Sequence, residues 1–233
     1  MTTRPILEIA VESLAAAQAA ERAGADRIEL CADLRNGGLT PSAEFMRQVR
    51  AAVKIRIHAI IRPRPGDFVY RIEEIAQMRN HIVQAREAGM NGIVLGVLCL
   101  DATVDVRATK ELIAFAHPLD STFHRAFDEC TDLLAAMESV ILTGTKRILT
   151  SGGAPDVMQG MNTLQSLIHS ARQRIIIMPG GGIRPDNLQS VRRISGAHEF
   201  HSGLGTVLPY GTADSSQFEQ QVRELAFHLS AAE

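Results

Sequence analysis

The chain has 233 residues, enough to bury a sizeable core in one or two domains. Its 24 basic and 26 acidic residues give a formal net charge of −2, which provides no general attraction to nucleic acid or to an anionic membrane. The N-terminus lacks the apolar core of a signal sequence, and no apolar run reaches the roughly 18 residues that span a bilayer. We therefore expect a soluble protein without nucleic-acid or membrane partners.

Short apolar runs alternate with helical patterns from one end of the chain to the other. Helical spacing is clearest within residues 72–88, where Ile75, Met78, Ile82 and Ala85 would share one face. Eight strand–helix repeats without a linker predict a single α/β domain over residues 1–233, a (β/α)8 TIM barrel. A doubly wound sheet is the alternative, because sequence cannot show closure. The strand candidates lie near residues 6–10, 26–30, 55–61, 92–95, 120–124, 146–150, 175–178 and 198–201.

Alternation along each strand predicts which side chains face the barrel interior. With Leu7 and Ile9 packed on helices, Glu8 faces inward, and the same rule directs Glu29, Arg62 and His124 inward from later strands. We expect these four to meet at the C-terminal face, where catalytic residues of this fold collect. A buried ion network filling the barrel mouth is the alternative. His58 is expected in the core with a hydrogen-bonded partner, and not as a metal ligand.

Residues next to these strand ends extend the candidate site. Arg125 and Asp128 follow His124 directly, and Arg125 or Arg62 could hold an anion in a bidentate manner. Two glycine-rich segments, Ser151-Gly152-Gly153 and Gly180-Gly181-Gly182, follow the sixth and seventh strands. Their amides predict an anion-binding site, with tight turns as the alternative.

The lysines and the missing motifs narrow the chemistry. Lys54, Lys110 and Lys146 all lie away from the C-terminal ends of the predicted strands, which disfavours Schiff-base chemistry there. No phosphate-binding loop of nucleotide enzymes, serine-hydrolase elbow or zinc-protease motif is present, so no nucleotide cofactor is implied. Proton transfer of the isomerase or lyase kind on a small anionic or phosphorylated substrate stays open. In that hypothesis Glu8 or Glu29 is the base and His124 an acid or electrophile.

Cysteine usage bears on both compartment and metal binding. Cys31, Cys99 and Cys130 are odd in number and widely spaced, which argues against a disulfide framework and favours a reducing cytoplasm. Cu(I) prefers thiolate and thioether ligands, usually at least two, so Cys99, Cys130 or Met178 would have to approach Cys31. A lone cysteine is more often a small buried apolar residue.

Along the chain stand, in order, the motifs LEIAVES, GADRIELCADLRNGGLTPS, IIRPRPGDFVY, TFHRAFD, RILTSGG, IMPGGGI and EFHS. In these motifs the chain resembles the copper homeostasis CutC family. The resemblance implies a TIM barrel, a cytoplasmic role in copper handling, and copper binding by cysteines near the first two strands. Ala10 stands where members often have one of these cysteines, leaving Cys31 as the candidate copper ligand, and HSGLGTVLPYGTADSS is shorter than in many members. Homo-oligomerisation through the helical shell is also plausible for such barrels.

Overall fold

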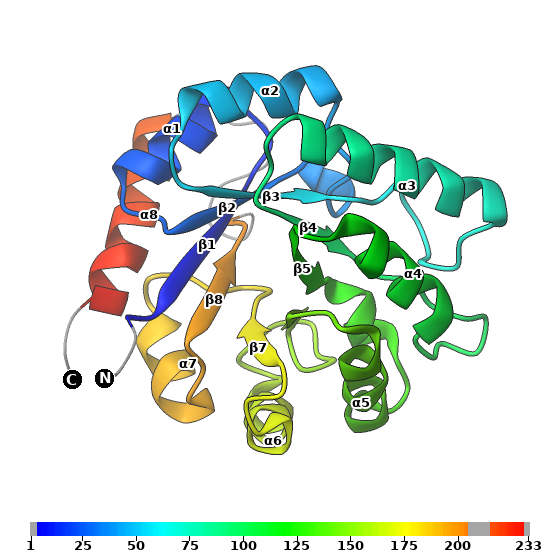
Figure 1. Cartoon of the computed structure of the whole chain (residues 1–233). Helices are drawn as coiled ribbons and strands as arrows, with labels where there is room; N and C mark the ends of the chain where they lie inside the picture. Colours follow the sequence, from blue (N-terminus) through cyan, green and yellow to red (C-terminus); the bar gives the residue numbers. More distant parts are fainter. Residues whose placement is uncertain (1–3, 205–214, 231–233) are drawn as a thin grey trace.

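The computed structural model describes residues 4–204 and 215–230, and it shows eight parallel strands ringed by helices (Figure 1). The strands follow the order β7-β6-β5-β4-β3-β2-β1-β8. A parallel bridge between Gly180 and His201 joins the two outermost strands, so the sheet is a nearly closed barrel. The predicted (β/α)8 TIM barrel is confirmed, and the doubly wound sheet is excluded. The predicted shorter loop after the last strand falls largely on residues 205–214, outside the described residues.

Every strand lies within one residue of its predicted position, and a helix follows each strand. The strands are β1 (Ile6–Val11), β2 (Arg27–Leu30), β3 (Arg56–Ile60), β4 (Gly92–Leu95), β5 (Asp120–Phe123), β6 (Arg147–Thr150), β7 (Ile176–Pro179) and β8 (Glu199–Ser202). The helices are α1 (Leu14–Arg22), α2 (Ala43–Ala52), α3 (Ile72–Glu87), α4 (Val106–Ala116), α5 (Leu133–Thr143), α6 (Met161–Ala171), α7 (Leu188–Ser195) and α8 (Ser215–Ser230). Two short 3-10 helices, η1 (Leu34–Asn36) and η2 (Arg125–Glu129), follow β2 and β5.

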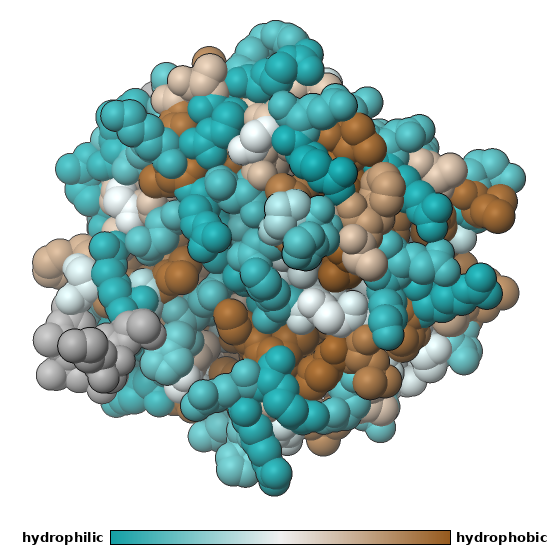
Figure 2. Space-filling view, viewed as in Figure 1, coloured by the Kyte–Doolittle hydropathy of each residue, from teal (hydrophilic) through white to brown (hydrophobic). Residues whose placement is uncertain are grey.

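The main apolar core lies between the sheet and the helices. Leu7, Ile9 and Ile28 belong to it, as alternation along the strands predicts, and a separate small cluster forms around Cys31, Ile60 and Val94. The face of the molecule seen in Figure 2 is mostly hydrophilic, with apolar patches between the polar side chains. Among the described residues, no helix is both long and apolar enough to cross a membrane.

A buried ion network crosses the barrel interior. Arg27 pairs with Glu8 and, at 2.6 Å, with Glu199. Arg147 continues the chain of charges to Glu199 at 3.1 Å and to Asp120 at 3.0 Å. Charges removed from water in this way are tolerated only when they compensate one another. This network is not the one considered from the sequence, which joined Glu8 to Glu29, Arg62 and His124 at the barrel mouth; the two share only Glu8.

His58 lies within this network without a hydrogen bond. Its ring nitrogens are 3.9 Å from Glu8 Oε2 and 3.8 Å from Asp120 Oδ2, and neither has a hydrogen-bond partner. Burial lowers the pKa of His58 to about 3, so the ring is neutral at physiological pH. Its core location is as expected, but the expected hydrogen-bonded partner is wrong. The neighbouring carboxylates are held by arginines instead.

Candidate functional site

A cavity of about 630 Å³ opens beside the C-terminal ends of the strands, where ligands bind in this fold. Most of the predicted site residues line it. Those that do are Glu29, Arg62, His124, Arg125, Asp128, Gly153, Gly181 and Gly182, whereas Glu8, Cys31, Ser151, Gly152 and Gly180 do not.

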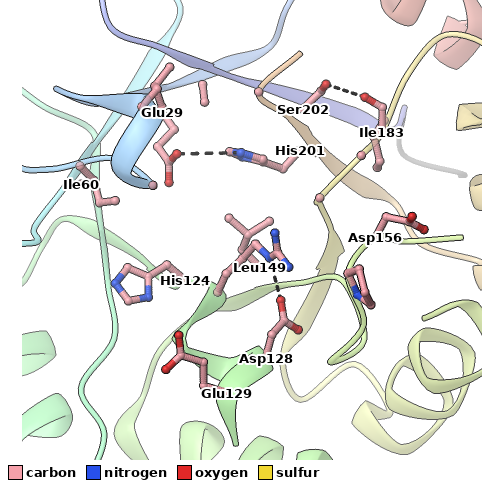
Figure 3. Close-up of a pocket in the computed structure, with 18 of the residues that line it drawn as sticks. Glu29, Ile60, His124, Asp128, Glu129, Leu149, Asp156, Ile183, His201 and Ser202 are labelled. Atoms are coloured by element: carbon pink, nitrogen blue, oxygen red, sulfur yellow. Dashed lines mark hydrogen bonds and ion pairs between the residues drawn. The ribbon is translucent and has the colours of Figure 1, made fainter. Parts of the chain in front are cut away.

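His201 is the imidazole that lies between the carboxylates of Glu8 and Glu29. Figure 3 shows its contact with Glu29. Its Nδ1 lies 2.8 Å from Glu8 Oε1, and its Nε2 lies 3.9 Å from Glu29 Oε2. Pairing in the sheet sets these positions, because Glu8 lies opposite both Arg27 on β2 and His201 on β8. Arg62 and His124 were expected to meet Glu8 and Glu29, but the partners of these two carboxylates are Arg27 and His201.

The two carboxyl groups have opposite proton affinities. Burial opposes ionisation of Glu8, but the adjacent Arg27 and the hydrogen bond with His201 together hold its pKa well below the usual range. Burial raises the pKa of Glu29, and the nearby charge of Glu8 adds to the effect against the opposing His201. Burial likewise opposes protonation of His201, but Glu29 and Glu8 outweigh it and raise the pKa of the ring. Glu29 is consequently the better proton carrier and Glu8 a permanent anion.

Glu8, Glu29 and His201 also form a potential metal-ligand group. One ligand atom from each lies within 4.8 Å of the others, and all three residues are buried. The donor set of imidazole nitrogen and carboxylate oxygen is of the kind that binds divalent transition metals.

Cys31 lies against Glu29 but is poorly suited to bind a metal. Its thiol donates to Glu29 Oε2 at 3.4 Å, and burial, reinforced by the charge of Glu29, raises its pKa well above the usual range. The other sulfur candidates have different partners. Cys130 donates to the Ala126 carbonyl at 3.9 Å, and Met178 accepts from Arg27 at 3.3 Å. A thiol that keeps its proton and donates it in a hydrogen bond is a weak metal ligand.

Arg62 holds two loops in place at the mouth of the cavity. Its guanidinium donates to the carbonyls of Asn36 at 2.8 Å, Gly38 at 3.2 Å and Gly66 at 2.9 Å. The guanidinium carbon also lies 4.9 Å from the centroid of the Phe68 ring, which lines the cavity. These neutral partners fix the position of the charge without neutralising it.

His124 contacts the same aromatic ring as Arg62, that of Phe68. Its ring centroid lies 4.8 Å from that of Phe68, and its Nδ1 accepts the amide of Ala126 at 3.2 Å. Burial, with a smaller contribution from the positive charge of Arg62, lowers the pKa of His124 to about 3. The ring is therefore neutral, and it acts as a donor and not as an acid that titrates near pH 7.

Asp128 organises the loop after β6. Its carboxylate accepts from the Thr150 hydroxyl, from the Ser151 amide at 3.1 Å and from the Gly153 amide at 2.9 Å. Arg125 donates from Nε to Asp128 and from Nη2 to the Ser151 hydroxyl, both at 2.8 Å. The amides of Ser151 and Gly153, expected to bind an external anion, are thus bound to the protein's own carboxylate.

The loop after β7 retains free donors. The Gly180 amide donates to the Thr150 carbonyl at 2.9 Å, whereas the amides of Gly181 and Gly182 have no acceptor among the described residues. Gly181 has a φ of +102°, and a β-carbon there would lie 3.1 Å from Arg125 Nη1. Only glycine combines this backbone conformation with so close a guanidinium. Of the two predicted glycine segments, this one has two amides without an acceptor among the described residues.

Sequence reasoning missed several polar residues of the cavity, among them His201, Glu129 and Asp156. His201 could have been found, because it lies two residues after Glu199 on β8 and so shares its inward face. Glu129 ends the short 3-10 helix η2 and Asp156 lies on the loop after β6, and no periodic signal marks such positions.

The fold and the cavity define a TIM-barrel protein with a cavity at the C-terminal face of its sheet. The model of the CutC family matches residues 5–206. A CutC family protein of Agrobacterium fabrum is 42% identical, covering 97% of this chain and 94% of that one. The human copper homeostasis protein cutC homolog is 44% identical over 84% of this chain and 72% of its own. The crystal structure of the putative copper homeostasis protein CutC from Streptococcus agalactiae superposes with a TM-score of 0.81 at 29% identity, covering 85% of this chain and 98% of that one. The chain belongs to the CutC family.

Proposed function

We propose that this protein serves copper homeostasis in the cytoplasm by binding a copper ion between His201 and Glu29. The observation that carries the proposal is the group of three buried ligand atoms, from Glu8, Glu29 and His201, within 4.8 Å of one another. The names of the human and streptococcal relatives support the link with copper. The three free cysteines support a reducing compartment.

The donor atoms favour Cu(II) over Cu(I). Imidazole nitrogen and carboxylate oxygen suit Cu(II), whereas Cu(I) selects thiolates, and the Cys31 thiol holds its proton. Glu8 accepts the Nδ1 proton of His201 and directs Nε2 toward Glu29. A carboxylate placed in this way orients a ligating histidine and raises its basicity. Glu8 is then a positioning residue, and His201 and Glu29 are the ligands.

A competition titration with a Cu(II) chelator tests this assignment. We expect one Cu(II) per chain, with affinity at least about tenfold weaker in His201→Gln and Glu29→Gln, and unchanged in Cys31→Ser. Glu129→Gln is the matched control for Glu29→Gln, because Glu129 lies across the same cavity (Figure 3). The proposal fails if Cys31→Ser removes copper binding under reducing conditions while His201→Gln retains it.

A second candidate function is acid–base chemistry on a small anion. The raised pKa of buried Glu29 favours it, because this carboxyl group holds a proton more readily than an ordinary glutamate and can both give and take one. His201, held by Glu8, would be its partner in proton transfer. Turnover lost in Glu29→Gln but kept in Glu129→Gln would support this function, once a substrate has been identified by its binding.

A further inference from the structure

Two buried N–H groups, in side chains that line the cavity, have no hydrogen-bond acceptor among the described residues. They are Nε of Arg62 and Nε2 of His124, in side chains that are 6% and 5% exposed. Both residues line the cavity, and both contact Phe68. A buried donor without a partner lowers stability, so two such donors in one cavity indicate a ligand that accepts their hydrogen bonds.

The hydrogen bonds of His124 determine which nitrogen carries the proton. Nδ1 accepts from the Ala126 amide at 3.2 Å, so in the neutral ring the proton is on Nε2. Nε2 therefore has a hydrogen to donate and no lone pair for a metal ion. This distinguishes His124 from His201, whose Nε2 faces the carboxylate of Glu29.

Arg62 adds a permanent positive charge to the same region. Its hydrogen-bond partners are the carbonyls of Asn36, Gly38 and Gly66, and its side chain also interacts with the Tyr70 hydroxyl. No ion pair to Arg62 is formed within the described part of the chain. The charge of Arg62 acts to lower the pKa of Glu129, but the two side chains do not form an ion pair. A buried guanidinium that lacks a counter-charge is unfavourable unless an anion neutralises it.

We propose that Arg62 and His124 form an oxyanion subsite, which binds the carboxylate or phosphate group of a small organic anion through Arg62 Nε and His124 Nε2. The free amides of Gly181 and Gly182 lie along the same cavity together with Arg125, and they favour the same class of ligand. The cavity volume of about 630 Å³ suits a small molecule. The subsite goes beyond the copper proposal and depends on neither copper nor turnover.

The test is titration of the metal-free protein, in the presence of a chelator, with inorganic phosphate and separately with acetate. Chloride keeps the ionic strength constant. Binding is followed by calorimetry and by the imidazole ¹⁵N signals. We expect at least one of the two anions to bind and to shift the His124 Nε2 signal. Preference for phosphate indicates a phosphate ester as the natural ligand, and preference for acetate indicates a carboxylic acid.

Variants separate the subsite from a general charge effect. His124→Phe keeps a ring but removes the donor and should weaken anion binding about tenfold or more, whereas His124→Gln restores a donor and should recover part of it. His81→Phe is the matched control, because His81 is also partly buried with an unpaired Nδ1 but does not line the cavity. The inference is overturned if neither anion binds beyond the effect of chloride, or if His124→Phe binds as the unaltered protein does.

The copper and anion proposals fail independently. His201→Gln should lose Cu(II) while it retains the anion, and His124→Phe should show the reverse. Anion binding lost in His201→Gln but retained in His124→Phe would place the anion at the proposed copper ligands and refute the Arg62–His124 subsite.

Discussion

Arg27 is the cation on which the buried ion network depends, and its removal should be severe. The side chain is 1% exposed and bridges Glu8, which is fully buried, and Glu199, which is 9% exposed. Arg27→Met keeps much of the length of the side chain but leaves two carboxylates without this counter-charge. Breaking a buried pair by removing one partner costs about 3–5 kcal/mol. At roughly 2–4 °C per kcal/mol for a chain of this size, the melting temperature should fall by roughly 6–20 °C.

The measurement is reversible urea unfolding, supported by thermal melting. Arg22→Met is the matched control, because Arg22 makes a similar pair with Glu219 at 2.8 Å but is 55% exposed. Its loss should be only about 0–1 kcal/mol. Adding Glu199→Gln to Arg27→Met should recover part of the stability, since one uncompensated charge is then gone. Equal losses in Arg27→Met and Arg22→Met would refute the view that burial makes this network strong.

Three further predictions concern pH and the loop after β6. Stability should fall as pH decreases from about 6.5 toward 3, because histidine in the unfolded chain takes up a proton near its ordinary pKa of about 6.5, whereas the pKa of both His58 and His124 is about 3 in the folded state. Urea unfolding at successive pH values checks this, and the decline should be shallower in His124→Gln. Asp128→Ala should lower the unfolding free energy by about 1–3 kcal/mol because it leaves buried donors unpaired, and an unchanged urea midpoint would contradict the role of Asp128 in the loop. Gly152→Ala should cost more than Gly144→Ala in the same assay, since both have positive φ but only the new β-carbon at residue 152 meets a backbone oxygen, at 2.5 Å; equal losses would show that crowding is unimportant there.

The fold could be predicted from the sequence because its signals are local and repeated. Each strand is a short apolar run, and each interval shows helical spacing, so eight weak signals support one architecture. Alternation also gave the inward face correctly for Glu8, Glu29 and His124. The physical basis is the two-residue period of a strand, which does not depend on distant residues.

The height of a side chain inside the barrel could not be predicted in the same way. Alternation places Glu8 and Glu29 on the inner surface, but pairing of β1 with β2 sets Glu8 beside Arg27 and Ala10 beside Glu29. Glu8 therefore lies one layer deeper and meets the ion network, while Glu29 reaches the cavity. Register between strands depends on the stagger of the whole barrel, and no single strand contains that information.

The hydrogen-bond partners of a loop were the other feature that the sequence could not predict. The segment Ser151-Gly152-Gly153 has the composition of an anion site, and its amides do bind a carboxylate, but that carboxylate belongs to Asp128. A glycine-rich segment predicts that its amides will meet negative charge. It does not reveal whether the charge comes from a ligand or from a residue that folding places there.

Glu8 joins the ion network to the cavity, and this position determines how the site should be probed. Its two oxygens serve Arg27 on one side and His201 on the other. Glu8→Gln would perturb the network and the orientation of His201 at once, so lost copper binding in that variant would not separate a ligand from a structural role. Glu29 contacts neither arginine of the network by an ion pair, and its nearest polar partners are Cys31 and His201. Glu29→Gln is therefore the substitution that changes the chemistry of the site with the least effect on the barrel.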